Sequence, residues 1–392
     1  MTTGTAPPLP AGLRRAATLA VLTACVFVVG TAEWVMVGLL PELSADLRRP
    51  LPTTGSLVTW YALVVTVAGP LVTVAMSRLP RRRALLVLLG VFVVGNLAAA
   101  LAGGFGALVV ARMLTALTHS TAFAVTVVIA TATAPASGRG RAIATVTAGW
   151  NLATVLGAPL GTWIGDLFGW RVTFWAITAL AALVLCAVAV LVHPPASQET
   201  TRPGSALRPR AALVLAIIVV AQTGLFTTYT YIAPLLRQVS GFTGSEVTIL
   251  LTLFGLGALC GNVLGGRLAD RAPWAGLCAL LAALAGVLAA FTLTGDVRWT
   301  AAVTVLVLGV ITAALVPLLQ DRALAAAPEA PTLITAISAS AFNLGVAGGS
   351  HLGGHALTTG FTLRDLPWLG ALVAAGAVLL AVTTAHRSRT TP

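Results

Sequence analysis

Apolar runs of about twenty residues recur from one end of this sequence to the other, and a run of that length spans a bilayer as a helix. The alternation expected of a membrane β-barrel is absent. Only 9% of the 392 residues are charged, whereas soluble domains carry about 25%. So few charges cannot cover a water-soluble surface of this size. The sequence therefore predicts an all-α integral membrane protein.

Twelve such runs can be placed, and they fall into two sets of six. The predicted spans are 16–40, 55–77, 84–102, 106–130, 140–165 and 171–192, then 212–236, 245–270, 272–292, 299–320, 331–357 and 366–386. The first run resembles a signal peptide, but it continues to Leu40 and many spans follow, so we interpret it as an uncleaved helix. The expected organisation is a six-helix bundle at 1–192, a cytoplasmic linker at 193–211 and a second six-helix bundle at 212–392.

The distribution of arginine predicts how the chain crosses the membrane. All 23 basic residues are arginine, and the net charge is +12. With the N-terminus inside, sixteen arginines fall in inner segments and six in outer ones. The positive-inside rule then places both termini in the cytoplasm of a multi-pass plasma-membrane protein. Topology explains the positive charge, so we expect no nucleic-acid partner.

The two sets of helices repeat one pattern. Pro41 is expected to end the first helix and precedes Ser77-Arg78 by 36 positions. Pro234 is expected to end the seventh helix and precedes Asp270-Arg271 by the same interval. Asn151-Leu152 and Gly157-Ala158-Pro159-Leu160-Gly161 recur 192 positions later as Asn343-Leu344 and Gly349-Ser350-His351-Leu352-Gly353. Parallel halves with this relation place a substrate site between them, near the middle of the membrane.

The turns after the second helix of each half resemble a signature of the major facilitator superfamily. Ser77-Arg78-Leu79-Pro80-Arg81-Arg82-Arg83, with Thr73 four residues before it, is similar to Gly-x-x-x-Asp-Arg-x-Gly-Arg-Arg. It departs in three places: Thr73 stands for the first Gly, Ser77 for the Asp and Pro80 for the second Gly. The second copy, Gly266-Arg267-Leu268-Ala269-Asp270-Arg271, keeps the Gly and the Asp. The resemblance implies two pseudo-symmetric six-helix bundles. It also implies gating turns that contain Arg78, Arg82, Gly266, Asp270 and Arg271.

The fifth predicted helix resembles the antiporter signature of the twelve-helix drug/proton antiporters. The matching residues are Gly149, Gly157, Pro159 and Gly161. Small residues allow helices to approach closely, and proline bends the backbone. Gly30-Thr31-Ala32-Glu33 and Tyr231-Ile232-Ala233-Pro234 are similar to one branch of that family, which contains chloramphenicol-resistance exporters and sugar, arabinose and purine-nucleoside efflux proteins.

Glu33 is the acidic residue most consistent with proton coupling. It lies eight residues before Pro41, which would place it about 12 Å inside the membrane. A carboxylate at that depth faces a cavity or a partner, where it can take up and release a proton. Arg112, which matches an arginine that the family links to proton coupling, is expected at similar depth on the fourth helix. Two alternatives stay open: Glu33 as a fixed structural partner of an arginine, and Arg112 reaching to the headgroups.

Besides His386 at the very end of the last one, three histidines lie within predicted spans. His119 is two turns beyond Arg112 on the same helix face, and it either titrates during transport or is a neutral packing residue. His351 and His355 are four residues apart, a spacing that can bind metal. With no acid or cysteine near them in sequence, we expect packing or polar lining and no metal site. The four cysteines are expected to be packing residues.

Polar and aromatic residues on the expected cavity helices are candidates for the substrate pocket. Asn151 and Asn343 occupy equivalent repeat positions, which favours a paired role, although hydrogen bonds between helices would explain them equally well. The candidates are Tyr61, Trp150, Asn151, Gln222, Tyr229, Phe342 and Asn343.

These features predict proton-coupled secondary active efflux of a small neutral or weakly cationic amphipathic compound, such as a phenicol antibiotic. Export of sugars or nucleosides, and uptake or uniport by the same fold, are the alternatives. The expected partners are a small-molecule substrate, protons and the lipid bilayer, with the proton gradient as energy source and no bound cofactor. We expect a monomer. A membrane enzyme is disfavoured because no metal-binding His/Glu motif, nucleophile elbow or phosphate loop is present.

Overall fold

The computed structural model describes residues 11–135, 138–192, 209–327 and 331–390. This part of the chain is helical and contains no strand. The elements are α1 Ala11–Asp46, α2 Leu51–Met76, α3 Arg81–Ala100, α4 Phe105–Thr133, α5 Arg139–Leu152, η2 Ala153–Gly157, α6 Ala158–Phe168, α7 Trp170–Leu191, α8 Pro209–Tyr229, α9 Ile232–Gln238, α10 Gly244–Arg271, α11 Pro273–Thr294, α12 Arg298–Ala326, α13 Pro331–Thr358, η3 Leu363–Asp365 and α14 Leu366–Thr390. Most of the predicted linker, residues 193–208, lies outside the described residues.

Each of the twelve predicted spans has a helical counterpart. The fifth is assembled from α5, η2 and α6, and the seventh from α8 and α9. Eleven spans within the described residues are long and apolar enough to cross a membrane. The remaining helix, α13, contains many Gly, Ser and Thr residues, and it packs against α8 and α2. The all-α, twelve-helix architecture expected from hydropathy is confirmed.

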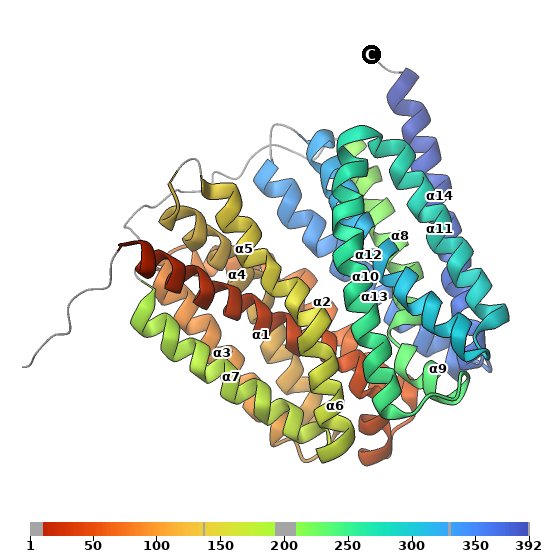
Figure 1. The fold of residues 1–392 in the computed structure, drawn as a ribbon, viewed down its shortest axis with the longest axis horizontal. Helices are drawn as coiled ribbons and strands as arrows, with labels where there is room; N and C mark the ends of the chain where they lie inside the picture. The colour runs from red at the N-terminus through yellow and green to blue at the C-terminus, as the bar shows by residue number, and fades with distance from the viewer. Residues whose placement is uncertain (1–10, 136–137, 193–208, 328–330, 391–392) are drawn as a thin grey trace, which may run out of the picture.

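The helices form two bundles, α1–α7 and α8–α14, which lie side by side in Figure 1. We call the side on which α1 begins and α14 ends the termini face, and the other side, where α6 and α9 end, the distal face. The bundles lie together at the distal face, and the helices of the first bundle lean away towards the termini face (Figure 1). Contacts between the bundles run mainly through α2 with α13, α6 and η2 with α10, and α1 with α9.

Two prolines act differently from expectation. Pro41 was predicted to end the first helix, but α1 continues through it to Asp46, so Glu33 lies about 20 Å from that end. Pro234 was predicted to end the seventh span, but it lies inside α9. The break comes earlier, at Thr230 and Tyr231. The ring of a helical proline clashes with the carbonyl four residues before it, and here that carbonyl belongs to Thr230.

The fifth span is interrupted by one turn of π-helix, Ala153–Gly157, immediately before Pro159. Its glycines bring it against α1. A Cβ on Gly157 would lie 2.9 Å from the Thr31 Cβ, and a Cβ on Gly161 would lie 2.5 Å from the Val35 Cγ2. Glycine is therefore required for the close approach of these two helices.

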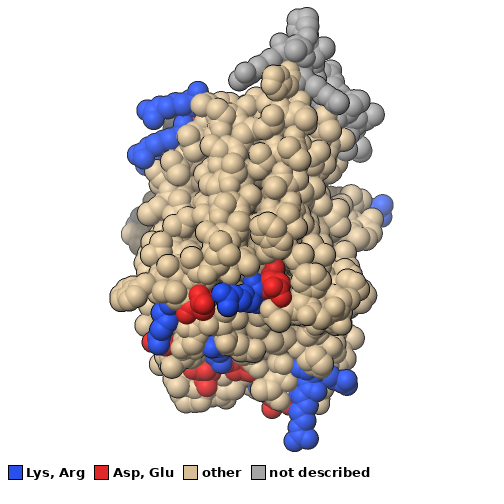
Figure 2. Space-filling view, turned by 90° about the vertical axis from the view of Figure 1, so that its right-hand side faces the viewer, with Lys and Arg blue, Asp and Glu red and all other residues tan. Residues whose placement is uncertain are grey.

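Charged side chains gather towards the two faces of the molecule. In Figure 2, acidic residues appear only in the lower part of the visible surface, among basic ones, and a broad uncharged band lies above them. Four arginines make five ion pairs with acids near the distal face: Arg171 with Asp46, Arg237 with Glu42 and Asp166, Arg298 with Glu246, and Arg364 with Asp296. An uncharged band of this kind is what contact with hydrocarbon requires.

Candidate functional site

Three polar side chains from three helices meet inside the first bundle. The Tyr61 hydroxyl on α2 is hydrogen-bonded to the Nδ1 of His119 on α4, at 3.0 Å. The other ring nitrogen, Nε2, lies 3.8 Å from the Oε2 of Glu33 on α1. Tyr61 and His119 are both buried, and about a fifth of the Glu33 side chain is exposed. The three groups form a polar chain from Tyr61 to Glu33, hydrogen-bonded between Tyr61 and His119 and open by 3.8 Å between His119 and Glu33.

Arg112 lies in the same cluster and is almost fully buried, at 1% exposure. Its guanidinium carbon lies 4.4 Å from the centre of the Tyr61 ring, which is within range of a cation–π interaction. The Nε and Nη1 atoms have no hydrogen-bond partner within the described residues, and neither does Oε2 of Glu33. Glu33 makes its closest ionic contact with His119. Arg112 makes its contact in this cluster with the face of the Tyr61 ring.

The packing of α1 explains why Glu33 faces this cluster. Thr31 and Val35 lie four residues apart on the face of α1 that meets Gly157 and Gly161. Glu33 lies midway between them in sequence, so it projects from the other side of the helix. The glycines of the antiporter-like helix thus support α1 from behind while Glu33 points towards α2 and α4.

An aromatic cluster lies on the other side of Glu33. Trp34 of α1 contacts Phe226, Tyr229 and Phe254 of the second bundle, with ring centroids 5.8 to 6.4 Å apart. Tyr229 and Phe254 also pack on each other at 4.5 Å. Adjacent residues of α1 therefore meet two different environments. Glu33 faces polar groups of its own bundle, and Trp34 faces aromatic rings of the other.

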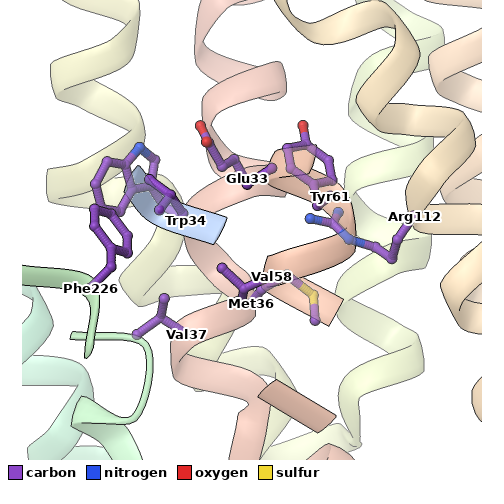
Figure 3. Close-up of a pocket in the computed structure, with 10 residues that line it drawn as sticks. Glu33, Trp34, Met36, Val37, Val58, Tyr61, Arg112 and Phe226 are labelled. Atoms are coloured by element: carbon purple, nitrogen blue, oxygen red, sulfur yellow. The ribbon is translucent and has the colours of Figure 1, made fainter. Parts of the chain in front are cut away.

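A small cavity of about 30 Å³ lies where these two environments meet. In Figure 3 the carboxylate of Glu33 and the hydroxyl of Tyr61 point to the same side, and Arg112 reaches in from α4. Trp34 and Phe226 form the opposite wall (Figure 3). A space of this size holds one or two water molecules. It is far smaller than the several hundred Å³ of a drug-sized site.

The predicted pocket residues divide into two groups. Tyr61 and Tyr229 belong to the polar and aromatic clusters just described, and Trp150 packs edge-on against His119 with ring centroids 5.2 Å apart. Gln222 and Asn343 lie elsewhere, on α8 and α13, and Asn343 bonds a carbonyl of its own helix. Phe342 packs against the apolar core of the second bundle.

Asn151 and Asn343 do not have the same surroundings, although they match in the repeat. The side-chain oxygen of Asn151 accepts a hydrogen bond of 2.9 Å from Asn262 on α10, which joins the two bundles. The side-chain oxygen of Asn343 has no partner within the described residues.

The predicted gating turns lie at the termini face. Arg78, Asp270 and Arg271 are exposed, and Asp270 makes no ion pair within the part of the chain that is described. Arg82 is partly buried and donates to the Ala189 carbonyl at the end of α7, inside its own bundle. Gly266 is partly buried, and a Cβ there would meet nothing within 4 Å.

The strongest polar link between the bundles lies instead at the distal face. Arg237 of α9 contacts Glu42 of α1 at 2.7 Å and Asp166 of α6 at 3.1 Å. Nearby, the Ser350 hydroxyl of α13 bonds the Gly55 carbonyl of α2 at 3.0 Å. None of the residues of this ion-pair cluster was a predicted site residue, and of the aromatic cluster only Tyr229 was. The available signals were an arginine close to Pro234 and a tryptophan next to Glu33.

Comparisons with known proteins agree with this architecture. Residues 22–350 match the model of the Major Facilitator Superfamily. The chain is 35% identical over 367 residues to the inner membrane transport protein YdhP of Escherichia coli K12, covering 92% of this chain and 94% of that protein. It is 31% identical to a probable sugar efflux transporter of Mannheimia succiniciproducens, covering 92% and 91% of the two chains.

Solved structures show the same fold at low identity. One is a bacterial homologue of the human lysosomal transporter Spinster in an inward-facing and occupied conformation. Its TM-score is 0.77 at 16% identity, with 99% of this chain and 98% of that one covered. The family match, the close relatives and the two-bundle helical architecture together show that this chain is a membrane transporter, and not an enzyme, of the Major Facilitator Superfamily.

Proposed function

We propose that this transporter is a proton-coupled exporter of small neutral or weakly cationic amphipathic compounds across the plasma membrane. The observation that supports this most directly is the position of Glu33. It lies between the polar chain of Tyr61 and His119 and the aromatic cluster around Trp34. One carboxyl group is thus next to both a proton relay and a surface suited to an apolar or cationic ligand.

The proton would bind at Glu33 and reach it through His119. With the Tyr61 hydroxyl donating to Nδ1, the neutral imidazole carries its proton on Nε2, the nitrogen that faces Glu33. A shift of less than 1 Å, or one bridging water, would bring the two groups within hydrogen-bonding distance. The Arg112 charge attracts the ionised carboxylate, and protonation of Glu33 removes that attraction. Proton binding therefore changes the balance of charge beside the substrate site.

Transport would follow alternating access, with the two bundles rocking about the central site. The ion pairs of Arg237 and the bond from Ser350 to Gly55 close the distal face in this conformation. If the termini face is cytoplasmic, as the arginine distribution favours, this is an inward-facing state. The inward-facing conformation of the Spinster homologue, which shares the fold, supports this interpretation.

The substrate is proposed from the chemistry of the walls. Aromatic rings favour flat apolar or cationic groups, and one carboxylate beside one guanidinium favours a ligand of little net charge. A phenicol antibiotic fits these requirements. Sugar export is the second candidate, because several relatives are named probable sugar efflux transporters. Nucleoside export, and uptake or uniport by the same fold, stay as alternatives.

Inverted membrane vesicles test the proton role. With an imposed proton gradient, the wild-type chain should accumulate substrate, and Glu33→Gln should abolish this uptake while Glu33→Asp keeps part of it. Glu246→Gln, which removes an exposed distal-face carboxylate, is the matched control and should transport normally. Undiminished proton-driven transport by Glu33→Gln would exclude the proposed role of Glu33.

A substrate panel in an efflux-deficient host separates the two candidates. Cells that express the chain should tolerate phenicols and related amphipathic compounds better than cells that express Glu33→Gln. If they instead excrete labelled sugars or nucleosides and gain no drug tolerance, the drug assignment is wrong and the second candidate is favoured.

A further inference from the structure

A second cavity, separate from the one beside Glu33, is a groove between α2 and α13 at the distal face. Its volume is about 250 Å³. One wall belongs to the first bundle and includes Ser56 and Thr59. The other belongs to the second bundle and includes His351 and His355. A ligand that fills this groove therefore contacts both bundles.

The two histidines are not packing residues. Both are exposed, and they lie one helical turn apart on the same face of α13. Their rings are stacked, with centroids 6.3 Å apart and planes inclined by 14°. Exposed rings on one helix face can rotate to bring a nitrogen from each towards a shared ion. Neutral imidazole is a preferred ligand of divalent transition metals.

The facing wall carries an independent sign of a ligand. Thr59 is 91% buried, and its hydroxyl has no hydrogen-bond partner within the described residues. Leaving a buried hydroxyl unpaired is costly. Ser56 next to it donates to the Thr53 carbonyl, which leaves the lone pairs of its oxygen free to accept. This wall can therefore hold the water molecules around a bound ion.

We propose that this groove binds a divalent transition-metal ion of the zinc class. His351 and His355 would supply two ligands to the ion. Among the described residues no third His, Cys, Asp or Glu joins them in a metal-binding group, so water completes the coordination shell. Those waters would donate to Thr59 and Ser56. The ion links the bundles at the distal face and stabilises the conformation in which that face is closed.

The first experiment measures binding, independently of transport. Thermal unfolding of the purified full-length protein is followed with increasing Zn²⁺, and with Mg²⁺ as a control. We expect Zn²⁺ alone to raise the unfolding temperature of the wild type and of His386→Gln, a control at the other end of the molecule. The shift should disappear in the His351→Gln/His355→Gln double variant. No shift in the wild type, or an equal shift in the double variant, would overturn the site.

A second variant tests the link between the bundles. Thr59→Val keeps the size of the side chain but cannot hold a metal-bound water, so its apparent Zn²⁺ affinity should fall about tenfold. Unchanged affinity would place the ion on α13 alone and refute the bridging role. Because the readout is binding, failure here leaves the proposed export function untouched, and the reverse also holds.

Discussion

At the residue scale, the candidate site is asymmetric even though the halves repeat. Pro234 follows Pro41 by 193 positions, and the same offset matches Glu33 to Phe226 and Tyr61 to Phe254. Glu33 and Tyr61 of the first half thus each have an aromatic counterpart in the second. Those counterparts are the rings that contact Trp34. The repeat therefore produces one polar wall and one aromatic wall around the same centre.

Tyr61 has two separable roles in the polar cluster, and two substitutions distinguish them. Tyr61→Phe removes the hydroxyl bonded to His119 but keeps the ring beneath Arg112. We expect a loss of about 1–3 kcal/mol in the free energy of unfolding, from the unpaired imidazole nitrogen, and slower proton-driven transport. Tyr61→Leu should destabilise further, since it also removes the cation–π contact. Equal unfolding temperatures for the two variants would contradict the role of the ring.

Trp34 is expected to act on the substrate and not on the proton. Trp34→Ala removes the ring that contacts Phe226 and Tyr229, so the KM for an aromatic substrate should rise while the pH dependence of transport stays that of the wild type. Vesicle uptake measured across substrate concentration and pH checks this expectation. A changed pH profile with an unchanged KM would assign Trp34 to proton coupling instead.

At the scale of elements, the fifth span determines where α1 lies. Its glycines meet the side chains of α1 at contact distances that a Cβ would violate. The π-helical turn before Pro159 lets the helix continue through a residue that has no N–H. The position of Glu33 thus depends on a helix that contributes no titratable group to the polar chain.

Two glycine substitutions in this span should have different effects on stability. Gly161→Ala places a methyl group against Val35 of α1 and should destabilise the protein by about 1–3 kcal/mol. Gly140→Ala, on the same span but with nothing within 4 Å of its Cβ position, should be neutral or stabilising by up to about 1 kcal/mol. The measurement is thermal unfolding of both variants in the same detergent. Similar shifts in unfolding temperature for both variants would show that the close approach of Gly161 to α1 does not determine stability.

At the scale of the whole molecule, the two faces have different charge balances. Six arginines and six acids lie in the distal segments, and most of those arginines are paired there. The remaining basic excess belongs to the segments of the termini face. Among the described ion pairs, those of Arg237 join one bundle to the other, so this residue is the one whose loss should favour opening of the distal face.

Arg237→Gln should shift the molecule towards a conformation open at the distal face. The probe is Ser350→Cys in a background without the four native cysteines, because Ser350 is buried between α2 and α13. Its reaction with a membrane-impermeant maleimide should become about tenfold faster in Arg237→Gln. Arg298→Gln, which breaks an ion pair inside the second bundle, is the control and should leave the rate unchanged. Equal rates in both variants would exclude Arg237 as a closing contact.

Several features of this protein follow from the sequence because they depend on local energetics. Charged side chains and backbone groups without hydrogen bonds are unstable in hydrocarbon, so the apolar runs alone identify twelve helices. The repeat indicates two bundles with a site between them, and distance from the predicted helix ends puts Glu33 and Arg112 at similar depth in the membrane. Helix ends were less predictable: Pro41 is accommodated inside α1, and Pro234 breaks its span one turn upstream.

The tertiary structure alone decides which side chains meet. His119 reaches Glu33, Trp34 inserts among rings from the other bundle, and Arg237 pairs with Glu42 and Asp166 across 195 and 71 positions of sequence. Such contacts depend on the rotation and close approach of whole helices, which the glycines of the fifth span permit but do not by themselves specify. The sequence thus determines that a charge lies within the membrane. The packing determines that Glu33 contacts a histidine on one side and faces an aromatic wall on the other, because a buried charge is stabilised only by partners brought to it in space.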